Sequence, residues 1–225
     1  METINLKKFF TDNHASRAWA TNETVSGIGS EIQHTRTLHA NLLAFINANN
    51  VGSMLDLPCG DLNWMQHVIV AQRTSHNPAF KYIGADIAPN LIEENKAKFP
   101  QHNFQVLNVA TSRLPKADLI FVRDCLVHLP FEFVWAALAN LARTEAKFVA
   151  ITTFPAHADN AELSGAELGG WRTLNLQDAP FNLPTPLAYI TEDCEEYGGV
   201  FRDKSLGVWS TAQINEAISA SKSNL

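Results

Sequence analysis

The sequence predicts an α/β protein with a doubly wound, mostly parallel sheet of seven strands that ends in an antiparallel C-terminal strand pair. Two observations support this fold class. Short apolar runs alternate with stretches whose apolar residues recur at helical spacing, as in a parallel sheet covered on both faces. The 225 residues, 46% hydrophobic and 18% charged, suit one globular domain with a substantial core. We therefore expect residues 1–225 to form a single domain.

The elements follow one another in a regular order. The expected strands are Ser53–Leu57, Lys81–Asp86, Phe104–Leu107, Ala117–Val122, Lys147–Phe154, Leu187–Thr191 and Ser205–Trp209. Apolar residues recur at helical spacing within residues 38–46, 64–69, 91–99 and 131–142. The last two strands are the expected antiparallel pair at the sheet edge.

Two segments lie outside this alternation. Residues 1–50 are expected to form an N-terminal helical cover. Residues 155–186 contain many prolines and glycines and little periodicity. We interpret them as a lid-like insertion over the active site, because too few apolar residues cluster there to build a second core.

Composition excludes several function classes. The 17 basic and 23 acidic side chains give a net charge of −6, which argues against a nucleic-acid partner and against a polybasic membrane patch. The three cysteines lie far apart and the eight histidines form no ligand pair, so neither a disulfide framework nor a metal site is expected. No apolar run approaches the roughly 18 residues of a membrane span. We expect a cytoplasmic protein.

Ligands of such sheets bind beyond the carboxyl ends of the strands, where the strand order reverses. The first expected strand is followed by a tight turn at Gly60, where a ligand can approach the backbone. The second ends at Asp86, a carboxylate that can accept hydrogen bonds from a ribose. Neither a GxGxxG fingerprint nor a P-loop is present. A turn with one glycine has little room for a pyrophosphate but still admits a nucleoside without phosphates, which points to S-adenosylmethionine (SAM).

The chain resembles the class I SAM-dependent methyltransferases over nearly its whole length. It is most similar to a bacterial subgroup whose first motif reads Asp-x-Pro-Cys-Gly-Asp-x-x-Trp-Met, matched here by residues 56–65. The general x-Gly-x-Gly-x-Gly pattern is kept only at Gly60, with Pro58 and Leu62 beside it. Further matches to the subgroup are residues 26–30, 82–87, 123–129, 171–176 and 203–207.

The resemblance implies a cofactor site. Asp86 would hold the ribose, Ile87 would pack on the adenine, and the pair at 108–109 would contact the adenine amino group. The cofactor-binding set is Asp56, Pro58, Cys59, Gly60, Asp61, Trp64, Asp86, Ile87, Asn108, Val109 and Arg123. Five of them have a structural alternative: Cys59 as a small turn residue, Trp64 as helix–sheet packing, Asp56 as a cap of its turn, Asp86 as an exposed strand-end acid and Asn108 as an ordinary turn residue.

His128 and Asp124 are the candidate catalytic residues. A neutral imidazole just past the fourth strand can remove a proton from the acceptor, and Asp124 can orient the ring. The alternative is a histidine packed at a helix start, with transfer driven by positioning alone.

The acceptor is expected to contact the segment 155–186 and the region before the first helix. Arg172 suits an acceptor with a carboxylate or phosphate, and Trp171 suits a ring or sugar. Asn175 and Arg36 complete the expected acceptor set. The alternative for Arg172 is a structural arginine that ties down its own loop.

The predicted function is therefore SAM-dependent methyl transfer to a small-molecule acceptor, at oxygen rather than nitrogen. An N-methyltransferase is one alternative, and a SAM-binding regulator without transfer activity is another. The (Asp/Asn/Ser)-Pro-Pro-(Tyr/Phe) turn of DNA amino-methyltransferases is missing after the fourth strand, where this chain has residues 123–126.

Overall fold

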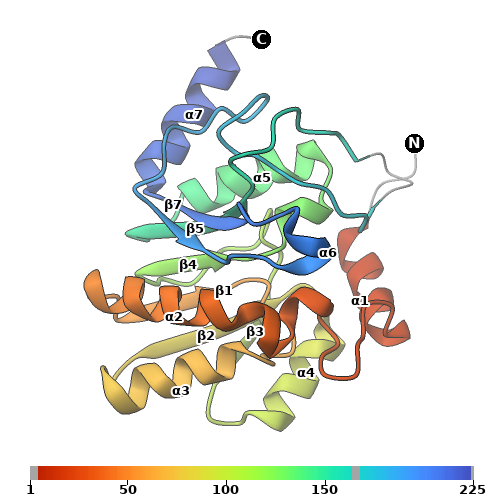
Figure 1. Cartoon of the computed structure of the whole chain (residues 1–225), viewed down its shortest axis with the longest axis vertical. Helices are drawn as coiled ribbons and strands as arrows, with labels where there is room; N and C mark the ends of the chain where they lie inside the picture. Colours follow the sequence, from red (N-terminus) through yellow and green to blue (C-terminus); the bar gives the residue numbers. More distant parts are fainter. Residues whose placement is uncertain (1–4, 164–167, 224–225) are drawn as a thin grey trace.

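A computed structural model describes residues 5–163 and 168–223 (Figure 1). Its seven-stranded sheet has the order β3-β2-β1-β4-β5-β7-β6. Strands β1 to β5 pair in parallel, and β7 runs antiparallel to both β5 and β6. The expectation of a doubly wound, mostly parallel sheet with an antiparallel C-terminal pair is confirmed.

The observed strands match the expected ones closely. They are β1 (Ser53–Asp56), β2 (Lys81–Asp86), β3 (Asn103–Val106), β4 (Leu119–Val122), β5 (Phe148–Thr153), β6 (Ala188–Thr191) and β7 (Ser205–Trp209). The bounds of β2 and β7 are as expected, and the other strands end within one or two residues of the expected positions. Apolar runs mark buried strands well because both faces of this sheet are covered.

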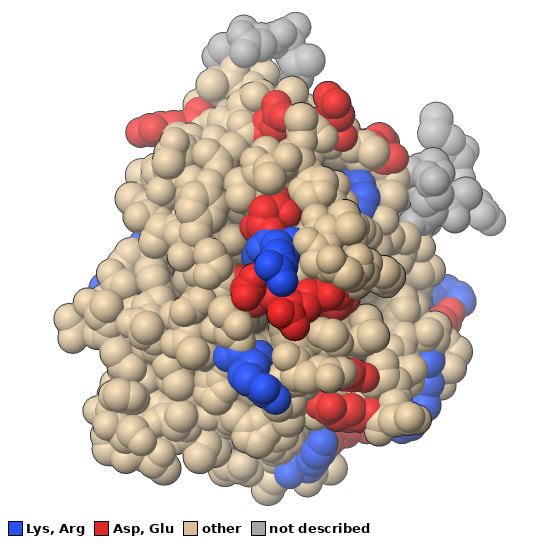
Figure 2. All heavy atoms as spheres, viewed as in Figure 1, with Lys and Arg blue, Asp and Glu red and all other residues tan. Residues whose placement is uncertain are grey.

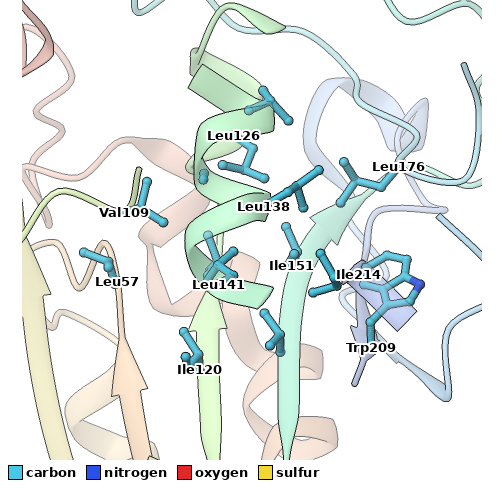
Figure 3. Close-up of a cluster of buried hydrophobic side chains, with 14 of the residues drawn as sticks. Leu57, Val109, Ile120, Leu126, Leu138, Leu141, Ile151, Leu176, Trp209 and Ile214 are labelled. Atoms are coloured by element: carbon cyan, nitrogen blue, oxygen red, sulfur yellow. The ribbon is translucent and has the colours of Figure 1, made fainter. Parts of the chain in front are cut away.

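Helices pack on both faces of the sheet (Figure 1). One face carries α2 (Ile32–Ala48), α3 (Met65–Ser75) and α4 (Pro89–Lys98), and the other carries α5 (Phe131–Ala142) and α7 (Thr211–Ser223). Neighbouring strand residues serve opposite faces: Ile120 packs with α5, whereas Phe121 packs with α2 and α3. Figure 3 shows Leu138 and Leu141 of α5 over β4 and β5.

The N-terminal segment begins with α1 (Leu6–Ser16), and a short η1 (Ile28–Ser30) precedes α2. The described part of residues 155–186 contains neither helix nor strand. Several of its residues are nevertheless buried in the core on the α5 side: Leu174, Leu176, Phe181 and Leu183. This segment therefore completes the core as well as reaching the cavity described below.

The strand order reverses between β1 and β4, which are neighbours in the sheet but far apart in sequence. The carboxyl ends of β1, β2 and β4 consequently meet at one edge, followed by Leu57, Ile87 and Arg123. This is where an open α/β sheet binds its ligand. In the part of the chain that the structure describes, no helix is both long and apolar enough to cross a membrane.

Candidate cofactor site and active site

A cavity of about 500 Å³ opens at this edge of the sheet. Its volume lies in the range of about 300–1,000 Å³ typical of small-molecule sites. Twelve of the expected site residues line it: Asp56, Pro58, Cys59, Gly60, Asp61, Trp64, Asp86, Ile87, Arg123, Asp124, His128 and Trp171. The fold thus brings together most of the residues singled out in the sequence.

The loop after β1 forms one wall of the cavity. Asp56 is buried and accepts a hydrogen bond from the Tyr82 hydroxyl at 2.8 Å. Burial raises the pKa of the Asp56 carboxyl to about 7, although the Tyr82 hydrogen bond opposes the shift. Burial also raises the pKa of the Cys59 thiol well above its ordinary value, so the thiol is protonated near neutral pH and poorly suited to act as a nucleophile.

Gly60 cannot be replaced by a larger residue without strain. Its φ of +53° lies in the left-handed region. A Cβ at this position would stand 2.5 Å from the Ser26 hydroxyl oxygen. The glycine therefore lets the N-terminal cover approach the first-motif loop directly.

Asp61 fastens the N-terminal cover to this loop. Its carboxylate accepts hydrogen bonds from the Thr24 hydroxyl at 2.8 and 2.9 Å, from the Val25 N–H at 3.0 Å and from the Ser26 hydroxyl at 3.1 Å. The Ser26 hydroxyl oxygen accepts in turn from the Asp61 N–H at 3.0 Å. Asp61 lines the cavity, but these bonds give its carboxylate a structural task.

Asp86 ends β2 on the opposite side of the first-motif loop. It is 7% exposed, and its Oδ1 accepts a hydrogen bond from the Ala88 N–H at 3.0 Å. Burial raises the pKa of this carboxyl, while nearby backbone N–H groups limit the rise. A carboxylate offers about four acceptor positions. Asp86 can therefore still accept from a hydroxyl of a molecule in the cavity.

Three buried charged side chains and the partly buried Asp124 form a network at the carboxyl end of β4. The Arg123 guanidinium contacts the Glu192 carboxylate at 2.7–3.2 Å, the Asp124 carboxylate at 3.2 Å and the Gly29 carbonyl at 2.9 Å. Lys204 Nζ lies 2.7 Å from Asp124 Oδ2 and 3.3 Å from Glu192 Oε2. Two cations and two anions compensate one another, as buried charges require.

Asp124 lines the cavity together with two other members of this network, Arg123 and Lys204. Its φ of +48° places it in the left-handed region, and its N–H donates to the Thr152 hydroxyl at 2.8 Å. Burial alone would raise its pKa, but Arg123 and Lys204 lower the pKa of Asp124 overall. Within the described structure, its Oδ1 is buried and makes no hydrogen bond.

The His128 ring has a defined tautomer. Nδ1 lies 2.9 Å from the Gly170 carbonyl oxygen, which only accepts, so Nδ1 carries the proton in the neutral ring. The ring stacks on Trp19 with centroids 4.9 Å apart, and both residues line the cavity. Burial lowers the pKa of His128. The imidazole is therefore neutral at pH 7, with the Nε2 lone pair available.

Trp64 and Trp171 both line the cavity but differ in exposure. Trp64 is 8% exposed, packs on Phe121 with centroids 6.1 Å apart and lies under the Arg123 guanidinium. Trp171 is 43% exposed and stands edge-on to Phe201 at 4.8 Å. Trp64 thus contributes to packing, which agrees with the helix–sheet packing alternative given for it. Trp171 forms part of the cavity mouth.

Arg172 lies outside the cavity lining, contrary to the expectation of an acceptor contact. Its guanidinium is buried and donates to the carbonyls of Leu126, Val127, Leu129 and Ala161 at 2.6–3.2 Å. This is the structural alternative: the arginine ties its own segment to the chain after β4.

Four further expected residues also lie outside the large cavity: Arg36, Asn108, Val109 and Asn175. Asn175 Nδ2 donates to the His157 carbonyl, and its Oδ1 accepts from the Gln177 N–H, so this side chain shapes its own turn. Arg36 is exposed on α2. Asn108 Oδ1 accepts from the Ala110 N–H at 2.8 Å, which matches the alternative of an ordinary turn residue.

Asn108 and Val109 line a separate cavity of about 40 Å³. Phe10, Pro58, Ile87 and Cys125 line both cavities, so the two adjoin. The expected contact of the pair 108–109 with adenine stays a prediction.

Comparisons with known proteins identify the fold. No protein-family model and no curated protein matches the chain. Among solved structures, it is similar to magnesium protoporphyrin IX methyltransferase from Synechocystis PCC 6803 with bound SAM, with a TM-score of 0.58 and 16% identity over 92% of this chain and 97% of that chain. It is also similar to PigF with S-adenosylhomocysteine (SAH), with a TM-score of 0.55 and 13% identity over 79% of this chain and 56% of that chain. The chain has the fold of a SAM-dependent methyltransferase. Membership of the bacterial subgroup stays a prediction.

Several residues that line or support this cavity were not predicted from the sequence. Lys204 and Glu196 line the cavity, and Glu192, the residue just after β6, contacts Lys204. Lys204 falls within the stretch 203–207 that resembles the subgroup, so a signal for it existed. Glu192 and Trp19 carry no such signal, because their roles depend on how β6 and the N-terminal segment fold back over the sheet.

No group of three or more His, Cys, Asp and Glu side chains among the described residues is arranged to hold a metal ion.

Proposed function

We propose that this protein is an enzyme that transfers a methyl group from SAM to a hydroxyl oxygen of a small molecule. One observation carries the proposal: on this fold, Asp56, Gly60, Asp86, Asp124 and His128 line a single cavity at the switch point of the sheet. The similar structures with bound SAM and SAH support the same cofactor.

The residues present fit SAM. Asp86 retains acceptor capacity for a ribose hydroxyl, and Gly60 presents backbone without a side chain. Asp56 begins the loop where the resemblance puts the methionine end, and Asp124 lines the same cavity. SAM as a whole is cationic at neutral pH, so a wall with several carboxylates suits it.

SAM would supply a methyl group activated by a positively charged sulfur. The chain's own task is then to align the acceptor oxygen with that methyl group and to accept its proton. Nε2 of His128 is the acceptor nitrogen of the neutral ring, so the hydroxyl proton would pass to it as the oxygen–carbon bond forms. The Gly170 carbonyl and Trp19 hold the ring in place.

Transfer to oxygen is favoured over transfer to nitrogen because a neutral, oriented imidazole is suited to deprotonating a hydroxyl. A SAM-binding regulator without activity is the second candidate. It has less support, since a partly buried histidine whose unprotonated Nε2 belongs to a ring that lines the cavity is a feature of a reacting site.

The test is a transfer assay with labelled SAM over fractionated cell extract, followed by mass identification of the labelled product. The proposal expects SAH release coupled to one labelled small molecule. Tight SAM binding with no SAH release from any fraction would favour the regulator. Absence of SAM binding would overturn the proposal.

A further inference from the structure

The basic groups of the cavity wall are already neutralised. The described lining residues include one arginine, Arg123, and one lysine, Lys204. Both contact the carboxylates of Asp124 and Glu192. Arg172 donates to backbone carbonyls elsewhere. The wall therefore offers no available cation to an anionic acceptor.

Two carboxylates lie together on the same wall, and they differ in how far their charge is already paired. Asp124 Oδ2 is ion-paired with Lys204 and Arg123, and its Oδ1 is buried without a hydrogen bond in the described structure. Within the described structure, Glu196 Oε1 accepts a hydrogen bond from a weak donor only, the Cys194 thiol at 3.7 Å. Both approach one point: a Cβ on Gly29 would lie 3.0 Å from Glu196 Oε1 and 3.8 Å from Asp124 Oδ2.

The other acids of the wall have tasks already. Asp56 accepts from Tyr82, Asp61 fastens residues 24–26, and Asp86 is assigned to the ribose. Asp124 is ion-paired with Arg123 and Lys204, so Glu196 is the carboxylate of the wall that is left for the acceptor.

Aromatic rings surround the mouth beside these carboxylates. Phe201 lies 4.8 Å from Trp171 and 6.0 Å from Tyr197 between ring centroids, and all three line the cavity. Tyr197 is 75% exposed although its ring borders the cavity. Aromatic faces close to carboxylates are a common environment for an organic cation, because ring quadrupole and acid attract the same charge.

The protein surface around the cavity mouth also carries acidic side chains. Figure 2 shows acidic side chains gathered around α6 (Glu196–Gly199), beside a basic one. Asp193 and Glu195 are exposed just before this helix, and Arg202 lies 3.8 Å from Glu195. Such a surface attracts cations toward the cavity and repels anions.

From these observations we infer that the acceptor is a hydroxyl compound that also carries an ammonium group, held between the Glu196 carboxylate and the rings of Trp171, Tyr197 and Phe201. The ammonium group is the anchor, since a protonated amine has no lone pair to methylate. This inference rests on the proposed function and replaces the expected anionic acceptor with a cationic one.

The test compares three matched probes that differ in charge: tyramine, 4-ethylphenol and 3-(4-hydroxyphenyl)propionate. Each is titrated by calorimetry into wild-type protein saturated with SAH. Tyramine should bind at least about tenfold more tightly than 4-ethylphenol, the ratio expected for a hydrogen bond between charged groups, and the propionate should bind most weakly. Equal affinities, tightest binding of the propionate, or no tyramine binding at millimolar concentration would overturn the inference.

The variant Glu196→Gln distinguishes a role of Glu196 in acceptor binding from a role in cofactor binding. Glu195→Gln is the matched control, because Glu195 lies outside the cavity lining. Glu196→Gln should lose the preference for tyramine and keep its melting temperature and its SAH affinity, whereas Glu195→Gln should retain all three. A loss of SAH affinity in Glu196→Gln would assign this carboxylate to the cofactor and overturn the inference. If the wild type fails to bind SAM or SAH, the proposed function itself fails instead.

Discussion

The Asp56 carboxyl group is almost completely buried. Its burial should affect how the stability of the protein depends on pH. Its pKa of about 7 in the folded protein exceeds the usual value of about 3.9 in an unfolded chain. Between pH 4 and 7 the native state therefore binds a proton that the unfolded state has released. The free energy of unfolding should fall as pH rises through this window.

Asp56→Asn removes this titration and keeps an oxygen for the Tyr82 hydroxyl. Chemical denaturation between pH 4 and 8 should show that the wild type loses more than about 1 kcal/mol relative to the variant as pH rises. Parallel stability profiles for the two proteins would mean that Asp56 is ionised across the whole range.

His128 gives the sharpest prediction for catalysis. His128→Ala should lower the rate of transfer roughly 10²–10⁴-fold, the usual contribution of a positioned base, with SAM affinity kept within a few-fold. Because burial lowers the pKa of the ring, wild-type activity should rise with pH below neutrality and be level above it. His157→Ala, outside the cavity lining, is the control. A rate within a few-fold of wild type would indicate a packing role.

Single residues also show where sequence reasoning stopped. Asp56 and Asp86 could be placed because the end of a parallel strand fixes the edge of the sheet at which its last side chain lies. Arg172 could not, since three of its four carbonyl partners are 43–46 residues away in the sequence. An arginine in a loop suits a ligand and a backbone anchor equally well, and only tertiary structure distinguishes the two.

At the scale of elements, the N-terminal cover depends on one side chain. Asp61→Ala removes the acceptor for three consecutive residues, Thr24, Val25 and Ser26. Hydrogen exchange should become faster across residues 24–30, with a loss of roughly 1.5–3 kcal/mol of stability, the range for hydrogen bonds to a charged group. Asp12→Ala, an exposed change on α1, is the control. Unchanged exchange in residues 24–30 would show that the cover is held by packing instead.

The segment 155–186 is anchored by Arg172. Arg172→Ala leaves buried carbonyls without donors and should cost roughly 2–4 kcal/mol in denaturant unfolding. Arg172→Lys should recover little of this, because one ammonium cannot replace the planar fork. In protein that remains folded, transfer kinetics should stay close to wild type. A raised acceptor KM with unchanged stability would return Arg172 to the acceptor site.

Elements differ in how far the sequence predicts them. The seven strands are recognisable because each is an apolar run bounded by turn residues, and burial on both faces makes these runs continuous. The helix α7 was not expected, although Ile214 and Ala217 are buried on one of its faces. The packing of residues 174–183 onto α5 has no periodicity to reveal it, since the segment is neither helix nor strand.

At the scale of the whole molecule, the strand order explains why the site exists. Because the order reverses between β1 and β4, the loops after them diverge and leave room for a ligand. The N-terminal segment, the loop after β6 and Trp171 then close around that opening. The net charge of −6 agrees with a wall richer in carboxylates than in free cations.

We propose that this cavity holds SAM with its ribose at Asp86. A crystal structure of the protein with SAH tests it most directly. We predict that the ribose hydroxyls lie within hydrogen-bond distance of Asp86, that the amino-acid end reaches the loop at Gly60, and that the sulfur faces His128. Electron density for SAH outside this cavity, or inside it without contact to Asp86, would contradict the account.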